Sequence, residues 1–289
     1  MPRTLARRPF RDDVELSIVG LGVITAIGME QSDVDALVTE SVEAGVNYID
    51  TGPRYGDGEG QQKLGLALRP HRDNVFIACK TGRRDAEGAL EELELSLEML
   101  HTDHVDLYQL HGVSSREDVE QILAPGGAAE GFLTARDQGK TRYVGLSAHD
   151  EDAAIAIMDG FPCDSILFPT NFACFAQGDF GPRVIEHAAS RNVARLALKA
   201  LAYRTWREGE ERTHPKAWYR PITSDQRELA RRALYFTLSQ DITAAIPPGD
   251  EQSYRMAVEL AADFEPMSEA DQQALLDSAA DLEPIFARA

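Results

Sequence analysis

Three short apolar runs decide the fold of this chain: VNYID over residues 46–50, VFIACK over 75–80 and VDLYQLH over 105–111. Each run ends in an ionisable residue, because Lys80 lies 30 positions after Asp50 and His111 lies 31 positions after Lys80. A step of this length matches one strand–loop–helix–loop unit. Ionisable residues at the ends of successive parallel strands are where a (β/α)₈ barrel carries its active site. The repeat therefore predicts a barrel and the position of its site.

The same alternation continues along the whole chain. Further apolar runs predict strands at residues 16–21, 142–146, 164–168, 193–198 and 241–246, which gives eight strands. The segments between them, such as 33–44 and 87–100, repeat apolar residues with the period of an amphipathic helix. Strict alternation implies a parallel sheet, and eight repeats indicate closure. No linker rich in Pro, Gly or Ser divides the chain, so residues 1–289 are predicted to form a single α/β domain, a (β/α)₈ TIM barrel.

Two connections are expected to be long loops. One follows the fourth strand over residues 111–118 and leads into a helix interrupted at 125–127, and the other follows the seventh strand over 200–224. Long loops in a compact domain often bind ligands. Three aromatic residues of the second loop are expected either to line a substrate pocket or to pack the loop against itself: Trp206, Trp218 and Tyr219.

The composition excludes several classes of protein. A formal net charge of −19 disfavours binding to nucleic acid or to anionic membranes. No window approaches eighteen uninterrupted apolar residues, the approximate minimum for a membrane span. The three scattered cysteines predict free thiols in a reducing compartment, and hence a cytoplasmic protein. The charge is also compatible with a salt-rich habitat, and the oligomeric state stays open.

Two further segments have simple interpretations. The basic stretch 1–11 lacks the apolar core of a signal peptide and is expected to be a polar arm or a short strand at the bottom of the barrel. The pair His101 and His104, with Asp106 nearby, could suggest a metal site, but no further ligand is evident, and a helix-to-strand turn is the better account. We expect no metal site.

The residues at the strand ends suggest proton chemistry on a carbonyl group. A tyrosine has an ordinary pKa near 10, which a neighbouring ammonium group lowers. Asp50 can serve as the counter-ion of Lys80, and Lys80 can then lower the pKa of Tyr55, which lies in the tight loop after Asp50. A neutral His111 can donate a hydrogen bond to a substrate oxygen. Such a set suits carbonyl reduction, provided that another group supplies the hydride.

Two motifs resemble those of the aldo-keto reductase family. The segment DTGPRYGDGE at 50–59 is similar to its signature D-x-x-x-x-Y-G-x-x-E, and LSLEMLHTDHVDLYQLH at 95–111 resembles S-L-x-x-L-x-x-D-x-x-D-L-Y-x-x-H. The GLS turn at 145–147 is also similar, and the likeness extends over nearly the whole chain. The resemblance implies an NAD(P)H-dependent reductase of aldehydes or ketones, with Tyr55 as the general acid, Lys80 and Asp50 lowering its pKa, and His111 orienting the carbonyl.

By the same resemblance, several residues are expected to bind the cofactor: Ser147, Asn171, Lys199, Pro248, Gly249 and Arg255. For Lys199 two roles are open, contact with the pyrophosphate of the cofactor or a salt bridge at the barrel rim. This sequence departs from the family pattern because Ala148 follows Ser147 and because no Gln is evident at the end of the sixth strand. Asp250 and Glu251 would repel a 2′-phosphate, which Arg255 could offset. NADPH is expected to be preferred only slightly over NADH.

Two other functions are open. One is a Schiff-base barrel aldolase that uses Lys80 or Lys199. The other is a non-catalytic, nicotinamide-binding regulatory subunit. The sequence does not identify the small-molecule carbonyl substrate.

Overall fold

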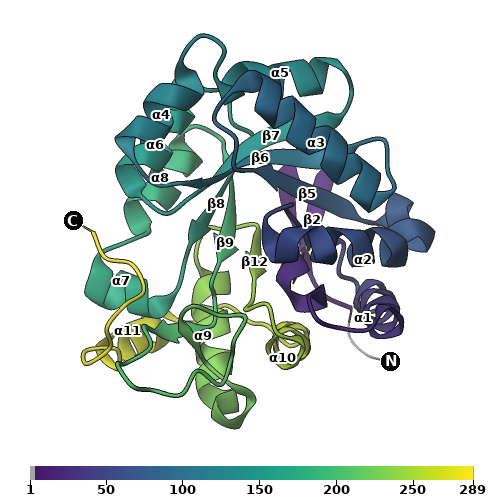
Figure 1. The fold of residues 1–289 in the computed structure, drawn as a ribbon. Coiled ribbons are helices and arrows are strands. Elements are labelled where there is room, and N and C mark those ends of the chain that lie inside the picture. Colours follow the sequence, from purple (N-terminus) through teal and green to yellow (C-terminus); the bar gives the residue numbers. More distant parts are fainter. Residues whose placement is uncertain (1–3, 289) are drawn as a thin grey trace.

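The computed structural model describes residues 4–288 and contains one parallel eight-stranded sheet surrounded by helices (Figure 1). Its strands are β3 (Leu21–Gly22), β4 (Tyr48–Asp50), β5 (Phe76–Thr81), β6 (Val105–Val113), β7 (Thr141–Ala148), β8 (Ser165–Pro169), β9 (Ala194–Leu198) and β12 (Ala244–Ile246). The strands lie side by side in chain order. A parallel bridge between Val19 and Ala245 joins the two ends of the sheet. The predicted (β/α)₈ barrel is therefore confirmed.

Helices alternate with these strands and cover the outside of the barrel (Figure 1). They are α1 (Gln31–Glu43), α2 (Glu59–Leu68), α3 (Ala86–Leu100), α4 (Arg116–Leu123), α5 (Ala128–Asp137), α6 (Glu151–Gly160), α7 (Phe172–Gly178), α8 (Pro182–Ser190), α9 (Arg227–Ser239), α10 (Glu251–Ala261) and α11 (Glu269–Asp277). Short 3₁₀ helices are η1 (Val23–Ala26), η2 (Tyr55–Gly58), η3 (Arg69–Asn74) and η4 (Ser224–Gln226). The two helices predicted at 33–44 and 87–100 correspond to α1 and α3.

Alternate residues of each strand point into the barrel, as the pleat requires. Their side chains form an inner core that is separate from the layer between strands and helices, and this inner core includes Tyr48, Phe76, Leu107 and Leu167. Because the inner positions follow a period of two, Asp50, Lys80 and His111 continue the inner rows of β4, β5 and β6.

The bottom of the barrel is closed by an antiparallel hairpin of β1 (Arg7–Arg11) and β2 (Val14–Ser17). Phe10 of this hairpin packs edge-on against Phe76 at 5.0 Å and against Tyr143 at 5.3 Å between ring centroids. Of the two interpretations of the N-terminal stretch, the short strand is correct for residues 7–11, whereas residues 1–3 lie outside the described part. The strand expected at 16–21 is divided between β2 and β3.

The two expected long loops differ from each other in the structure. After the fourth barrel strand, β6 extends to Val113 and α4 begins at Arg116, so the loop expected at 111–118 is short. The interruption at 125–127 separates α4 from α5. After the seventh barrel strand, residues 200–224 form a long excursion that includes the small antiparallel pair β10 (Ala202–Arg204) and β11 (Arg220–Pro221).

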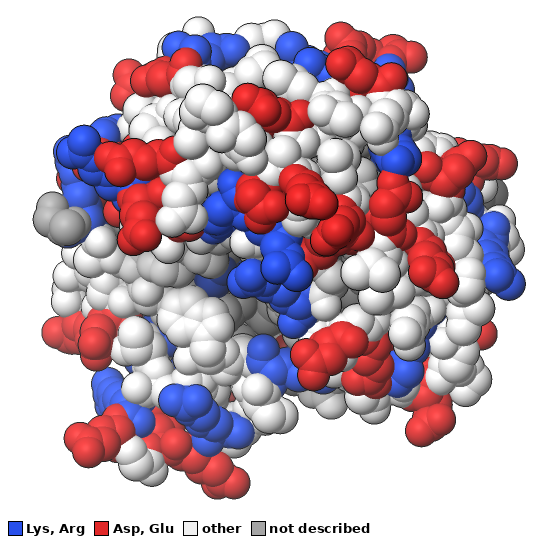
Figure 2. All heavy atoms as spheres, turned by 45° about the horizontal axis from the view of Figure 1, so that its top comes forward, with Lys and Arg blue, Asp and Glu red and all other residues white. Residues whose placement is uncertain are grey.

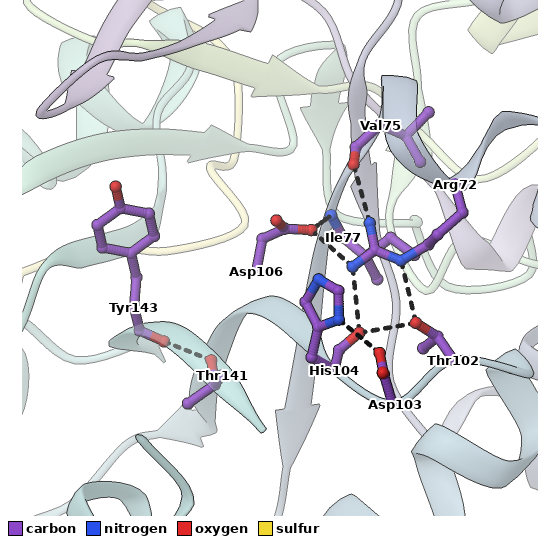
Figure 3. A network of polar contacts seen from close by, with 9 residues as sticks. All are labelled: Arg72, Val75, Ile77, Thr102, Asp103, His104, Asp106, Thr141 and Tyr143. Atoms are coloured by element: carbon purple, nitrogen blue, oxygen red, sulfur yellow. Dashed lines mark hydrogen bonds and ion pairs between the residues drawn. The ribbon is translucent and has the colours of Figure 1, made fainter. Parts of the chain in front are cut away.

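At the amino-terminal ends of β5 and β6, polar groups form a closed network (Figure 3). Arg72 donates hydrogen bonds to the carbonyl oxygens of Val75 and His104, both at 3.1 Å, and to Asp106 at 3.2 Å. Asp106 also accepts the backbone N–H of Ile77 at 2.8 Å. The residues that had suggested a metal site therefore connect a turn to two strands. No group of three candidate metal ligands occurs within residues 4–288.

The described part of the chain contains no helix that is long and apolar enough to cross a membrane. Its three cysteines, Cys79, Cys163 and Cys174, are all buried free thiols.

Candidate active site

A cavity of about 250 Å³ lies at the carboxyl-terminal ends of the barrel strands. Its lining includes all four residues expected to act in catalysis: Asp50, Tyr55, Lys80 and His111. Other parts of the wall come from η1, from the end of β7, from the loop after β9 and from the loop after β12. The cavity therefore gathers residues from most of the circumference of the barrel.

The register of the sheet explains how three of these side chains meet. Asp50 pairs with Ala78 across β4 and β5, and Lys80 pairs with Gln109 across β5 and β6. Lys80 thus lies two residues after Ala78, the partner of Asp50, and His111 lies two residues after Gln109, the partner of Lys80. All three positions face inward. The stagger of a closed barrel produces this stepwise offset. Side chains 30 residues apart therefore converge on one rim.

Tyr55 reaches the same cavity from the loop that follows β4. The backbone there takes positive φ values at Gly56, Asp57 and Gly58, of 61°, 50° and 90°. Glycine adopts such values without the Cβ clash that other residues suffer. This reversal presents the Tyr55 ring to the barrel mouth, where its hydroxyl lies 3.1 Å from Nε2 of His111.

Lys80 and Asp50 form an ion pair beneath Tyr55. The Lys80 side chain is 1% exposed, and its ammonium group contacts the Asp50 carboxylate and donates to the carbonyl oxygen of Thr51 at 3.1 Å. The other Asp50 oxygen accepts the Tyr48 hydroxyl at 3.3 Å. Burial alone would lower the pKa of Lys80, but the nearby Asp50 and Tyr55 raise it above its usual value, so the lysine stays charged.

The pKa of Tyr55 differs from the expectation. Burial raises it, the Lys80 charge lowers it and Asp50 raises it again, so the pKa ends above its usual value. The predicted depression of the Tyr55 pKa is therefore not seen in the protein alone, because desolvation outweighs the ammonium group. The phenol remains protonated at neutral pH and is a hydrogen-bond donor.

His111 is neutral over the same range. Burial, followed by the positive charge of Lys80, lowers its pKa to about 3. Nε2 faces the Tyr55 hydroxyl, whereas Nδ1 is buried without a hydrogen-bond partner within residues 4–288. A neutral imidazole beside a protonated phenol can hold a carbonyl oxygen between two hydrogen-bonding groups.

The residues expected to bind the cofactor separate into two groups. Ser147, Lys199 and Gly249 line the cavity, whereas Pro248 does not, although its neighbour Pro247 does. Asn171 is fully buried and caps helix α7 by accepting the N–H of Cys174 at 3.0 Å. Arg255 pairs with Glu40 and Glu251, so carboxylates already occupy its guanidinium group.

The three aromatic residues of the second loop also differ in position. Trp218 and Tyr219 line the cavity, and Trp218 is 52% exposed. Trp206 does not line it; its indole N–H donates to the carbonyl oxygen of Ala217 at 3.2 Å. Trp206 thus supports the segment that carries Trp218.

Three residues near the cavity were not found from the sequence. His149 follows the GLS turn, and its place at the end of a predicted strand could have drawn attention to it. Lys216 contributes to the wall and donates to the carbonyl oxygen of Thr25 at 3.0 Å. Phe286 stacks on His149 with ring centroids 5.1 Å apart, and no sequence pattern connects residues 149 and 286.

A second hollow of about 350 Å³ adjoins the cavity and shares Lys216, Ala217 and Gly249 with it. This hollow extends to the start of α10, where Asp250 caps the helix by accepting the N–H of Ser253 at 2.9 Å. The two hollows together form an elongated site that runs from Tyr55 to the first turn of α10.

Charge is unevenly distributed on the surface. On the face shown in Figure 2, basic side chains gather beside a central hollow, while acidic side chains are spread over the surrounding surface. A net charge of −19 therefore does not prevent local positive potential.

Comparison with known proteins identifies relatives. The chain is 30% identical over 148 residues to the uncharacterized oxidoreductase YqkF of Bacillus subtilis, covering 47% of this chain and 46% of the relative. It is 32% identical over 210 residues to the aldo-keto reductase YhdN of the same organism, covering 65% and 59%. The chain thus matches about half of the length of these relatives.

The fold is shared with a solved aldo-keto reductase of Klebsiella pneumoniae in complex with NADPH, with a TM-score of 0.71 and 21% identity over 100% of this chain and 98% of that one. The model of the aldo/keto reductase family matches residues 19–246, which include all four residues of the candidate catalytic group. The chain therefore belongs to the aldo/keto reductase family.

Proposed function

We propose that this protein reduces aldehydes or ketones to alcohols with a nicotinamide dinucleotide, and that Tyr55 donates the proton. The observation that carries the proposal is the 3.1 Å contact between the Tyr55 hydroxyl and Nε2 of His111, above the buried Lys80–Asp50 pair in one cavity. A carbonyl oxygen placed between Tyr55 and His111 would accept hydrogen bonds as negative charge develops on it.

The reaction assigns a separate task to each residue. Tyr55, which is protonated at neutral pH, transfers its proton to the carbonyl oxygen. Lys80 then stabilises the phenolate that remains, because its charge already acts to lower the Tyr55 pKa. Asp50 keeps Lys80 charged, and Tyr48 keeps Asp50 in place. A bound nicotinamide dinucleotide would supply the hydride.

The residues present fit the nicotinamide end of such a cofactor. Ser147 is only 2% exposed and lines the cavity. A hydroxyl in a cavity wall can both donate and accept a hydrogen bond, and it suits a polar ligand such as a carboxamide. Ser147 would hold this group, and Gly249 would border the path toward α10.

The preference between NADPH and NADH depends on the other end of the site. Asp250 and Glu251 line the second hollow and would repel a 2′-phosphate, while Lys216 and His214 line the same hollow and could attract it. We propose a slight preference for NADPH. Titration of the nicotinamide fluorescence with both cofactors measures this difference directly.

The Schiff-base alternative requires an uncharged lysine. Lys80 is paired with Asp50 and kept charged, which argues against it as the reacting amine. Burial lowers the pKa of Lys199 to about 7, so this alternative applies to Lys199 only. Borohydride trapping of a substrate adduct, read by mass spectrometry, would support it.

The test of the main proposal is the variant Tyr55→Phe. We expect the rate of carbonyl reduction to fall by about 10²–10⁴-fold, the usual contribution of a general acid, while the dissociation constant of the cofactor stays within about threefold. The rate is followed at the nicotinamide absorbance with a panel of aldehydes and ketones. A variant that retained most of the wild-type rate would show that Tyr55 is not the proton donor. Tight cofactor binding by the wild-type protein without turnover of any carbonyl would instead favour the regulatory subunit.

A further inference from the structure

Lys199 occupies an unusual position at the end of β9. Its backbone is left-handed, with a φ of 64°, although lysine has a Cβ atom that disfavours this region. The carbonyl oxygen of Lys199 accepts the N–H of Ala202 at 3.0 Å, which closes a tight turn. The turn directs the chain away from the barrel and leaves the lysine in the cavity wall. Strained backbone of this kind is found where a side chain must be presented to a ligand.

The ammonium group of Lys199 is surrounded by rings. It lies 3.2 Å from Nε2 of His149, 5.8 Å from the centroid of Trp218 and 5.6 Å from that of Phe286. His149 and Lys199 directly follow β7 and β9, Trp218 lies in the long second loop and Phe286 in the C-terminal segment; we call these four residues the Lys199 cage. Aromatic faces attract a cation, but they replace only part of its lost hydration.

No carboxylate pairs with Lys199 anywhere in residues 4–288. Three of the other lysines, Lys63, Lys80 and Lys140, each form an ion pair with a carboxylate. Among the described residues Lys216 also forms no ion pair, but the charged groups that act on it are mainly carboxylates, those of Asp250, Glu59 and Glu251. In a protein with 48 acidic residues and 29 basic ones, a cation in a cavity that lacks a counter-ion is unexpected. A bound anion would supply the ion pair that Lys199 does not form with the protein.

The cage leaves hydrogen-bond donors of Lys199 available. Burial and the Lys199 charge lower the pKa of His149 to about 3, so His149 is neutral and can accept one proton of the ammonium group through Nε2. An ammonium group has three donors and no acceptor. The remaining donors suit an oxyanion, and the aromatic walls suit the short carbon skeleton that carries it.

The location of the cage favours the substrate over the cofactor as the source of this anion. Lys199, His149 and Trp218 line the same cavity as Lys80 and His111, so the cage adjoins the catalytic group. The hollow toward α10 lies at the other side of the shared wall and has its own cation, Lys216. A molecule that reached both His111 and Lys199 would need a carbonyl group and an anionic group on one small skeleton.

We propose that Lys199 binds the carboxylate of the carbonyl substrate, and hence that this protein prefers oxo acids to neutral aldehydes and ketones. The inference rests on the proposed carbonyl reduction. His149, Trp218 and Phe286 position the ammonium group, and Tyr55 and His111 hold the carbonyl oxygen. Lys199 is thus a specificity-determining residue and takes no part in proton transfer.

The test compares each acid with its own methyl ester. Pyruvate with methyl pyruvate and 4-oxobutanoate with methyl 4-oxobutanoate provide two distances between the carbonyl and the carboxylate. We compare further the one of the two acids that the wild-type protein reduces with the higher kcat/KM. For this acid we expect kcat/KM to be higher than for its methyl ester. In Lys199→Met, kcat/KM for that acid should fall by about tenfold or more, mainly through KM, while kcat/KM for the ester changes by less than about twofold. Lys199→Arg keeps the charge and should retain part of the preference.

Matched controls separate this role from general effects. Lys140→Met removes a charge that is paired with Glu94 outside the cavity, and it should leave the ratio of acid to ester unchanged. A loss shared equally by acid and ester in Lys199→Met would overturn the proposal. The proposal would also fail if Lys199→Met raised the dissociation constant of the cofactor by about tenfold and left the ratio of kcat/KM for acid and ester unchanged. Lys199 would then bind the pyrophosphate of the cofactor.

Binding of succinate, an acid that cannot be reduced, distinguishes this proposal from the proposed function. Calorimetric titration of the protein with bound NADP⁺ should show succinate binding that is lost in Lys199→Met and kept in Lys140→Met. If no carbonyl is turned over but this difference holds, the reductase assignment fails and the anion site stands. If carbonyls are reduced and succinate does not bind to the wild-type protein, the anion site fails and the reductase assignment stands.

Discussion

The two rims of the barrel differ in how completely their charged side chains are paired. At the amino-terminal rim, Arg72 donates hydrogen bonds to a carboxylate and to backbone carbonyl oxygens (Figure 3). At the same rim, Arg11 pairs with Asp164 at 3.0 Å. At the carboxyl-terminal rim, Lys199 has no carboxylate partner among the described residues, and Nδ1 of His111 has no hydrogen-bond partner there. Complete pairing stabilises a fold, while incomplete pairing leaves groups available to ligands. The difference distinguishes the rim that holds the barrel together from the rim that carries the candidate active site.

The largest effect on stability is expected where the carboxyl-terminal rim does contain a pair. Asp50→Ala leaves Lys80 buried without its carboxylate and removes the acceptor of the Tyr48 hydroxyl. We expect the free energy of unfolding to fall by about 3–5 kcal/mol, as measured for broken buried pairs. Urea unfolding measures this loss. The double variant with Lys80→Met should recover much of the stability but none of the activity; if the double variant is as unstable as the single one, the buried charge is not the cause.

At the amino-terminal rim, Arg72→Ala should lower stability without changing catalysis. The variant removes the guanidinium donor from the Asp106 carboxylate and from two carbonyl oxygens, at a cost of about 1–3 kcal/mol. We expect kcat/KM to be unchanged because the network lies at the end of the barrel remote from the cavity. Arg116→Ala is the control: its pair with Glu120 is exposed and should contribute about 0.5 kcal/mol or less. A change in kcat/KM for Arg72→Ala would show that the two rims are coupled.

The smallest expected effect on the free energy of unfolding is an increase, and it concerns Lys199. Burial lowers the pKa of Lys199 to about 7, below its ordinary value, so the unfolded chain binds more protons than the folded one between that pH and about 10.4. The charged Lys199 therefore costs stability most fully below pH 7, and this cost diminishes as the pH rises. The groups that act on it are His149 directly after β7, Lys80 of β5, Asp50 of β4 and Cys174 of α7.

Lys199→Met should accordingly be more stable than the wild-type protein, with an advantage that is larger at pH 6 than at pH 9 by on the order of 1 kcal/mol. Partial exposure of the side chain and its cation–π contacts reduce the effect below the value for a fully desolvated lysine. Unfolding curves at the two pH values measure it. An advantage that is the same at both pH values would mean that Lys199 titrates normally.

The parts of the molecule that follow local rules could be predicted from the sequence. The period of two in the strands and the repeat of Asp50, Lys80 and His111 were sufficient to predict the barrel and to bring these three residues to one rim. The loop expected at 111–118 was wrong because β6 continues past His111 as far as Val113, and charged helix α4 follows at once.

The remaining features depend on distances that the sequence does not contain. The Lys199 cage joins residues 149, 199, 218 and 286, and no local pattern connects them. The direction of the Tyr55 pKa depends on a balance between burial and two opposite charges, which residue types alone do not determine. Arg255 has a suitable side chain for a phosphate, but Glu40, 215 positions away, already pairs with it.

The bridge between Val19 and Ala245 also has a consequence for how the protein folds. Closing the barrel joins segments near opposite ends of the sequence, and each adjoining strand must already be in register for the bridge to form. Contacts between residues so far apart in the sequence are expected to form late. The chain must first lose the conformational entropy of the long loop between them, and only then do the contacts stabilise the fold. Gly22, Val23 and Pro247, which contribute to the wall of the cavity at the candidate active site, meet across this same seam. The active site is therefore expected to be completed in the last step of folding, after the rest of the barrel has assembled.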